Sequence, residues 1–110
     1  MCNTMFITSA TTTDTGVILI PNREVKTLAN AGNYKIIIAC NVEATANEPV
    51  FIQTTLGNIP VLCKYGNTLY ANQLNKRRMY CIGYGNENTN YEDGQFVIFS
   101  RVNPRGTIGG

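Results

Sequence analysis

The sequence predicts an all-β fold, a single-domain antiparallel β-sandwich of the jelly-roll or Ig-like kind, with about eight short strands and at most one short helix. Most apolar segments alternate with a period of two residues or form short β-branched blocks, which is typical of strands. Gly-Asn and Asp-Gly dipeptides separate these segments at the spacing of a sandwich or small barrel. With 110 residues, the chain can bury one modest core.

The expected strands coincide with the apolar segments. Their ranges are 4–9, 16–20, 34–42, 48–56, 59–64, 68–71, 78–84 and 95–102. Only residues 22–32 have a helical pattern, with Asn22 as the N-cap and Gly32 as the stop, and their apolar positions are few. We expect one domain over residues 1–110, with extended arms at residues 1–15 and 103–110.

Alternation within these segments predicts which side chains face the core. In residues 34–42 both faces are fairly apolar, so we expect a strand that is covered on both sides. One face holds Tyr34, Ile36, Ile38, Cys40 and Val42, and the other holds Lys35, Ile37, Ala39 and Asn41. In the later strands the inward set is predicted to be Val50, Ile52, Thr54 and Leu56, then Phe96, Ile98, Ser100 and Val102.

Charge and composition limit the partners. The net charge of +2 and the pI of about 8.4 are too low for a general nucleic-acid binder, so we expect no nucleic-acid partner. The first 20 residues carry no cation and only short apolar runs, which predicts neither a signal peptide nor a membrane span. We therefore expect a protein made in the cytosol, without a membrane partner.

The four cysteines do not form a metal-binding pattern. No C-x-x-C pair is present, and the chain has no histidine to complete a zinc site. Three of them, Cys40, Cys63 and Cys81, lie in apolar strand-like runs, where a free cysteine behaves as a small buried apolar side chain. Disulfide bonds remain the alternative. Cys2 lies near the N-terminus.

Nothing in the sequence predicts catalysis. The chain lacks histidine, the usual general base, and its carboxylates lie mainly in turns or at strand ends. Cys81 follows three cations, but without histidine it has no evident base partner. No glycine-rich phosphate motif opens a helix. We expect no enzyme, no cofactor and no metal.

The segment 59–85, "IPVLCKYGNTLYANQLNKRRMYCIGYG", has a distinctive order. An apolar strand is followed by a Gly-Asn turn and a short strand in which Leu69 faces the core. Leu74 is then expected to fill the core, and a cationic turn precedes the next strand. Within about residues 50–100, this order resembles a β module of virion proteins of tailed bacteriophages, namely head decoration, auxiliary capsid, head-fibre and tail-fibre proteins. The chain has no coiled-coil stalk, which favours the head over the tail.

The resemblance implies a structural role without catalytic residues. The expected function is a virion structural protein that decorates or cements a tailed-phage capsid through strand faces and terminal arms. Its partner would be the major capsid protein or another virion protein, with many copies per particle, or it would form a homo-oligomer. The expected contact residues are Tyr70, Arg77 and Arg78 at the hairpin corner, and Arg101, Arg105 and Ile108 in the C-terminal arm.

Two alternatives remain open at this stage. A carbohydrate- or receptor-binding module of a phage fibre would use Tyr84, Tyr91, Asn88 and Asn90 in the loop "GYGNENTNYEDG". A single-stranded nucleic-acid-binding barrel would combine Lys76, Arg77 and Arg78 with stacking by Tyr65, Tyr70, Tyr80 and Tyr84.

Overall fold

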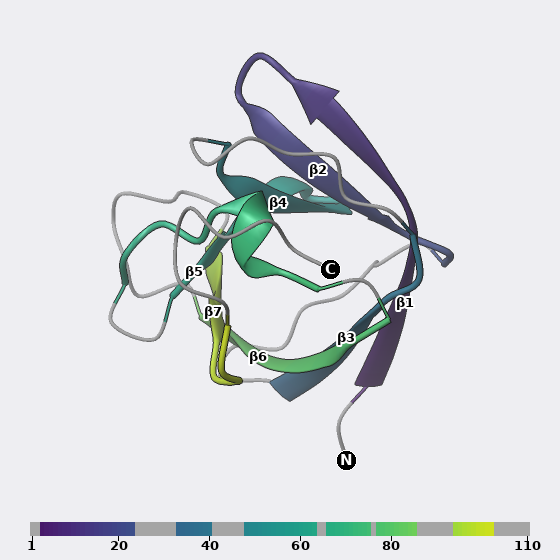
Figure 1. Ribbon diagram of the computed structural model, residues 1–110, viewed down its shortest axis with the longest axis vertical. Coiled ribbons are helices and arrows are strands. Elements are labelled where there is room, and N and C mark those ends of the chain that lie inside the picture. Colours follow the sequence, from purple (N-terminus) through teal and green to yellow (C-terminus); the bar gives the residue numbers. More distant parts are fainter. Residues whose placement is uncertain are drawn as a thin grey trace.

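The structure, a computed structural model, is a closed β-barrel. It describes residues 3–23, 33–40, 48–63, 66–75, 77–85 and 94–102. The strands are β1 (Asn3–Thr13), β2 (Gly16–Pro21), β3 (Asn33–Ile38), β4 (Val50–Thr54), β5 (Gly57–Leu62), β6 (Met79–Gly85) and β7 (Gln95–Ile98). Around the barrel their order is β1-β2-β4-β5-β7-β6-β3, and β3 pairs with β1 to close it (Figure 1).

The predicted sandwich is wrong, although the all-β class is right. One sheet closes on itself, and the pairs β1·β3, β2·β4 and β5·β7 are parallel, so the sheet is mixed rather than antiparallel. Turn dipeptides predict hairpins, and the hairpin pairs β1·β2 and β4·β5 do occur. Parallel pairs join strands that are not linked by a tight turn, so no local signal marks them.

Residues 4–9 were predicted to be a strand within an extended arm of residues 1–15, and the structure confirms a strand there, which is longer and covers residues 3–13. This strand, β1, has 11 residues and pairs with β2 on one side and β3 on the other. Its threonines are β-branched and suit a strand. A register shift between Ile7 and Ser9 breaks the ladder to β2. The C-terminal arm, residues 103–110, and nearly all of the candidate helix at residues 22–32 lie outside the described residues.

Alternating side chains fill the barrel as the sequence predicts. Tyr34, Ile36 and Ile38 of β3 are 5%, 0% and 0% exposed. Phe96 of β7 is fully buried and packs edge-on against the rings of Tyr34 and Tyr84, with centroid distances of 6.1 and 5.5 Å. The strands β1, β2, β4, β5 and β6 also contribute to the core, and β7 adds a second residue. These residues are Met5, Ile7, Val17, Leu19, Val50, Ile52, Ile59, Val61, Tyr80, Ile82 and Ile98.

The two predicted runs of inward-facing residues, in 50–56 and 96–102, extend beyond the ends of their strands. Leu56 is 51% exposed and Thr54 is half-buried, because β4 ends at Thr54 and the chain turns outward into β5. Ser100 and Val102 are also only half-buried, since β7 ends at Ile98. The alternation of apolar residues therefore predicts burial only within the strands of the barrel.

The sixth predicted strand, residues 68–71, is not a strand. Tyr70 makes only an isolated bridge with Pro49, and the chain then enters a short 3₁₀ turn, η1 (Ala71–Gln73). The Gln73 side chain causes this change, because its Oε1 accepts a hydrogen bond from the Tyr70 backbone N–H at 2.9 Å. Leu69 and Leu74 flank the turn and are 0% and 2% exposed, so both were correctly predicted to face the core.

Gly94 shows why β7 begins where it does. Its φ is +89°, a region that L side chains rarely adopt. An added Cβ would also lie 2.6 Å from Cζ of Tyr84, whose ring packs beneath it. Only glycine therefore allows the chain to pass over Tyr84 and enter the β6·β7 pair.

Candidate docking face

The outward side of β1, β3 and β6 carries a row of apolar side chains. Phe6 pairs in register with Ile37, and Ile37 pairs with Met79. Phe6 is 44% exposed, Met79 is 49% exposed and Ile37 is half-buried. Neighbouring strands lie about 4.8 Å apart, so these three side chains touch or nearly touch along a row about 10 Å long. The three strands lie side by side at the lower right of Figure 1.

A second row extends the same surface to the end of β7. Exposed Cys81 is the outward neighbour of Met79 on β6, two residues along the strand. The Phe99 backbone N–H donates a 2.8 Å hydrogen bond to the Cys81 carbonyl, which places Phe99 beside it. Phe99 is 55% exposed, the largest fraction among the exposed large apolar side chains of the described residues. We call Phe6, Ile37, Met79, Cys81 and Phe99 the outer apolar face.

The pleat explains why these side chains point outward. Tyr80 and Ile82, which flank Cys81, are fully buried, so Met79 and Cys81 must point to the other side of the sheet. The sequence predicted cover on both faces of residues 34–42. The barrel interior covers one face, while on the other Ile37 is only half-buried and Ala39 is exposed. Within the described ranges, no second layer covers this side.

Three cations lie at the border of the outer apolar face. Arg78 immediately precedes Met79 and is exposed, but its guanidinium carbon is 5.9 Å from the centroid of the buried Tyr80 ring, so its side chain leaves the end of the barrel on the inner side of the sheet. Arg101 is exposed and lies two residues beyond Phe99. Lys35 of β3 is half-buried and pairs in register with Cys81. The face is thus apolar at its centre and cationic at its border.

The described carboxylates lie elsewhere. Of the residues that the structure describes, only Asp14 and Glu48 are acidic, in the β1–β2 turn and just before β4. Neither belongs to β1, β3, β6 or β7. Within this described part of the chain, the outer apolar face therefore carries charges of one sign.

The structure divides the predicted contact residues into separate places. Arg78 and Arg101 lie at the border of the outer apolar face. Arg77 is exposed in the turn before β6, with a φ of 64°, and its backbone N–H donates to the Ile38 carbonyl. Tyr70 lies away from them, over β4 and β5. Arg105 and Ile108 fall outside the described residues.

Sequence reasoning missed the residues at the centre of the face. The alternation of residues 34–42 and 95–102 had already placed Ile37 and Phe99 on the outward side. Phe6 and Met79 had the same period-two signal within their own strands. Their adjacency depends on the pairing of β1 with β3 and of β3 with β6, which no turn signal predicted.

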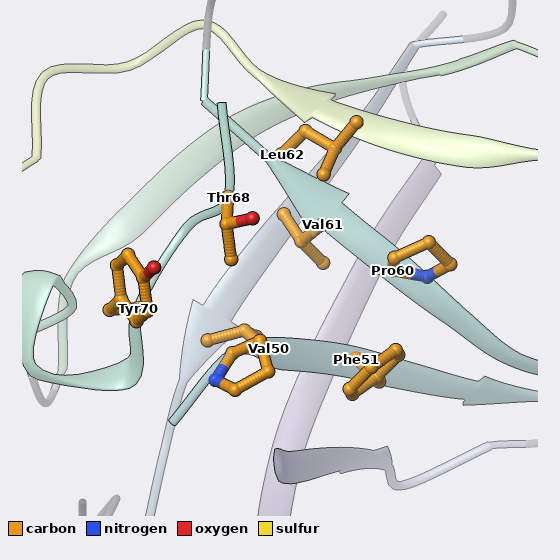
Figure 2. Close-up of a pocket in the computed structure, with 8 residues that line it drawn as sticks. Val50, Phe51, Pro60, Val61, Leu62, Thr68 and Tyr70 are labelled. Atoms are coloured by element: carbon orange, nitrogen blue, oxygen red, sulfur yellow. The ribbon is translucent and has the colours of Figure 1, made fainter. Parts of the chain in front are cut away.

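A shallow hollow of about 360 Å³ lies over β4 and β5. Figure 2 shows Tyr70 and Thr68 on one side of it and Phe51 and Pro60 on the other. The remaining lining residues are Pro49, Val50, Val61 and Leu62. The polar side-chain groups of its lining are the hydroxyls of Thr68 and Tyr70.

The described cysteines, Cys40, Cys63 and Cys81, lie in different surroundings. Cys40 and Cys63 are half-buried and pack against the core, close to the prediction, whereas Cys81 is exposed and the prediction that it is buried is wrong. Burial raises the pKa of the Cys63 thiol, which opposes formation of the reactive thiolate. Among the residues described, no group of three or more potential ligands could hold a metal ion.

The aromatic residues of both alternative functions are partly inaccessible. Tyr80 is 0% exposed and Tyr84 is 7% exposed, so neither ring can stack on a base or a sugar. The Tyr80 hydroxyl oxygen instead accepts a hydrogen bond from the Asn75 backbone N–H at 2.7 Å. Of the remaining residues proposed for these alternatives, the structure describes Tyr70, Arg77 and Arg78 but not Tyr65, Lys76, Asn88, Asn90 and Tyr91.

Comparisons with models of protein families, with curated proteins and with solved structures find no match to this chain. In the part of the chain that the structure describes, no helix has the length and apolar character needed to cross a membrane.

Proposed function

We propose that the protein is a non-enzymatic structural component of a larger protein assembly and attaches through its outer apolar face. The observation that carries this proposal is the continuity of the face. Phe6, Met79 and Phe99 are each about half exposed, and neighbouring strands hold them on one side of a closed barrel. Contiguous exposed apolar surface on a soluble domain is typical of an interaction site.

The scaffold suits a passive docking role. A closed barrel has no open sheet edge, so the backbone positions that carry its outer side chains are set before binding. Tyr70 is the only titratable side chain that lines the described hollow, and burial of Cys63 disfavours its thiolate. These features support adhesion rather than turnover of a substrate.

The resemblance of residues 50–100 to tailed-phage virion proteins supports a specific assembly, the phage capsid. In this proposal the barrel decorates or cements the head, with the major capsid protein or another virion protein as its partner. Many copies would bind per particle, and repeated weak contacts gain strength when they act together. A modest face on a small barrel is sufficient for such a role.

Co-sedimentation with assembled capsids tests the proposal. The substitution Phe99→Ser removes the most exposed apolar side chain of the face. Burying a whole phenylalanine side chain gains about 1.5–3 kcal/mol, so covering the exposed half gains roughly 1–1.5 kcal/mol, or about tenfold in affinity. We therefore expect Phe99→Ser to weaken each contact with the capsid about tenfold.

Leu56→Ser provides the matched control, because Leu56 is 51% exposed but lies in the β4–β5 turn, away from the face. It should leave capsid occupancy unchanged. Equal losses for the two variants, or no binding of the wild type, would contradict the proposal. Capsids for the assay should be assembled from the major capsid protein of a tailed phage.

A further inference from the structure

We infer that the surface which covers the outer apolar face is a protein surface with an apolar centre and carboxylates at its border, and not a second copy of this chain. This inference rests on the proposed function and specifies its partner. It depends on the placement of Lys35, Arg78 and Arg101 around the face.

Each cation lies within a short step of an apolar side chain of the face. Arg78 is the residue next to Met79, Arg101 lies two residues beyond Phe99, and both are exposed. Lys35 is directly opposite Cys81 across the β3·β6 pair. Its half-burial fits a side chain whose methylene stem lies along the sheet while the ammonium group reaches the border.

A second copy of the chain does not complement this charge pattern. In a twofold interface the same patch meets itself, so each charged group of one copy faces a group from the same patch on the other. Within the described residues, Lys35, Arg78 and Arg101 would meet no carboxylate of the second copy, because Asp14 and Glu48 lie on other elements. Like charges that lose water together at an interface oppose association.

A partner surface with carboxylates at its border avoids this repulsion between like charges. Apolar side chains of the partner would cover Phe6, Met79 and Phe99, and carboxylates at the border would pair with the three cations. Such pairs mainly fix orientation and exclude wrong partners, while the apolar centre supplies most of the affinity. Placement on a capsid lattice requires this combination, because every copy must bind in one orientation.

Anionic lipid and nucleic acid suit the same cations less well. Single strands are held by aromatic rings that stack on the bases, but Tyr80, next to Arg78, is fully buried. Membrane-surface binding uses many cations together with deep apolar insertion, whereas three cations here surround side chains that remain about half within the sheet surface. The observations therefore favour a protein partner.

The test compares two double variants that change the net charge equally. Lys35→Gln with Arg101→Gln removes two positive charges from the border of the face. Gln53→Glu with Asn67→Asp adds two negative charges at exposed positions away from it. In capsid binding at low salt, we expect roughly a tenfold loss for the first variant and little change for the second, with the difference shrinking as salt is added.

Carbodiimide cross-linking supplies an independent readout, because it joins an amine to a carboxylate in direct contact. Mass spectrometry should find Lys35 of the capsid-bound protein linked to Asp or Glu of the capsid protein. Sedimentation of the free protein should show a monomer. A dimer that disappears in the Phe99→Ser variant would overturn the inference in favour of a second copy.

The outcomes separate the inference from the proposed function. If Phe99→Ser weakens capsid binding but the Lys35/Arg101 variant does not, the docking role stands and the acidic border is wrong. If neither variant matters, the proposed function fails. Phe99-dependent binding to phosphatidylserine vesicles or to a single-stranded oligonucleotide, without capsid binding, would overturn both.

Discussion

Two phenylalanines on one strand segment test the inward and outward assignment directly. Phe96 is 0% exposed and its ring contacts two tyrosine rings, whereas Phe99 is 55% exposed. Truncation of a buried phenylalanine to alanine costs about 3–5 kcal/mol through lost burial and the cavity left behind. Truncation of an exposed side chain usually changes the free energy of unfolding by no more than about 0.5 kcal/mol. We therefore expect Phe96→Ala and Phe99→Ala to differ by about 3 kcal/mol or more.

Urea unfolding followed by circular dichroism measures this difference. A small domain loses about 1–3 kcal/mol of stability per molar urea, so the midpoint of Phe96→Ala should fall by roughly 2 M while that of Phe99→Ala stays near wild type. Since total stabilities are about 5–15 kcal/mol, Phe96→Ala risks complete unfolding. Phe96→Leu, which removes less volume and should cost less than Phe96→Ala, then provides the measurement. Equal shifts at the two positions would refute the barrel register.

Three further perturbations probe single contacts. Tyr80→Phe removes the acceptor of the Asn75 N–H and should cost about 1–2 kcal/mol, seen as a lower melting temperature. Gly94→Ala should cost about 2 kcal/mol or more in the same melting assay, because its φ is positive and the methyl group would overlap the tyrosine ring beneath it. Because burial raises the pKa of Cys63, its contribution to stability is complete below the unfolded-state pKa of about 8.5 and is lost as the pH rises, so Cys63→Ala should flatten that decline. Iodoacetamide at pH 8 should label exposed Cys81 several-fold faster than Cys63.

The strands and the core were predictable because both are local properties. A period of two marks a strand whose faces differ in environment, and it correctly placed Ile36, Ile52 and Phe96 inward. The inward Leu69 and Leu74 followed from the same reasoning. The pattern failed at residues 68–71. There the Gln73 side chain accepts a hydrogen bond from the Tyr70 backbone N–H, and the chain forms a 3₁₀ turn in place of a short strand.

The closure of the barrel was not predictable because it depends on long-range pairing. β1 pairs with β3 in parallel register, and β5 pairs with β7 through only two residue pairs. No dipeptide or spacing encodes these partners, and a sandwich and a barrel use the same alternation along each strand. The turn residues therefore predict the hairpins but do not distinguish a sandwich from a barrel.

The candidate docking face shows the same division between local and long-range information. Arg78 and Arg101 were singled out as contact residues from their positions in turns and at a strand end. Their relation to each other depends on the β6·β7 pairing, which brings the start of β6 to the end of β7. Tyr70 was grouped with Arg78 because the two are close in sequence, but its bridge to Pro49 holds it over β4.

The outward side of β3 connects the fold to the proposed function. The sequence places Ile37 opposite Ile36, and a strand that is apolar on both faces requires cover on both. A sandwich would supply one layer, and the second would have to come from another element. The barrel supplies only its interior, so Ile37 and its register neighbours Phe6 and Met79 keep exposed apolar area in the free chain. Because covering that area is favourable, the pattern that specifies the barrel core also leaves a face that a partner can bury.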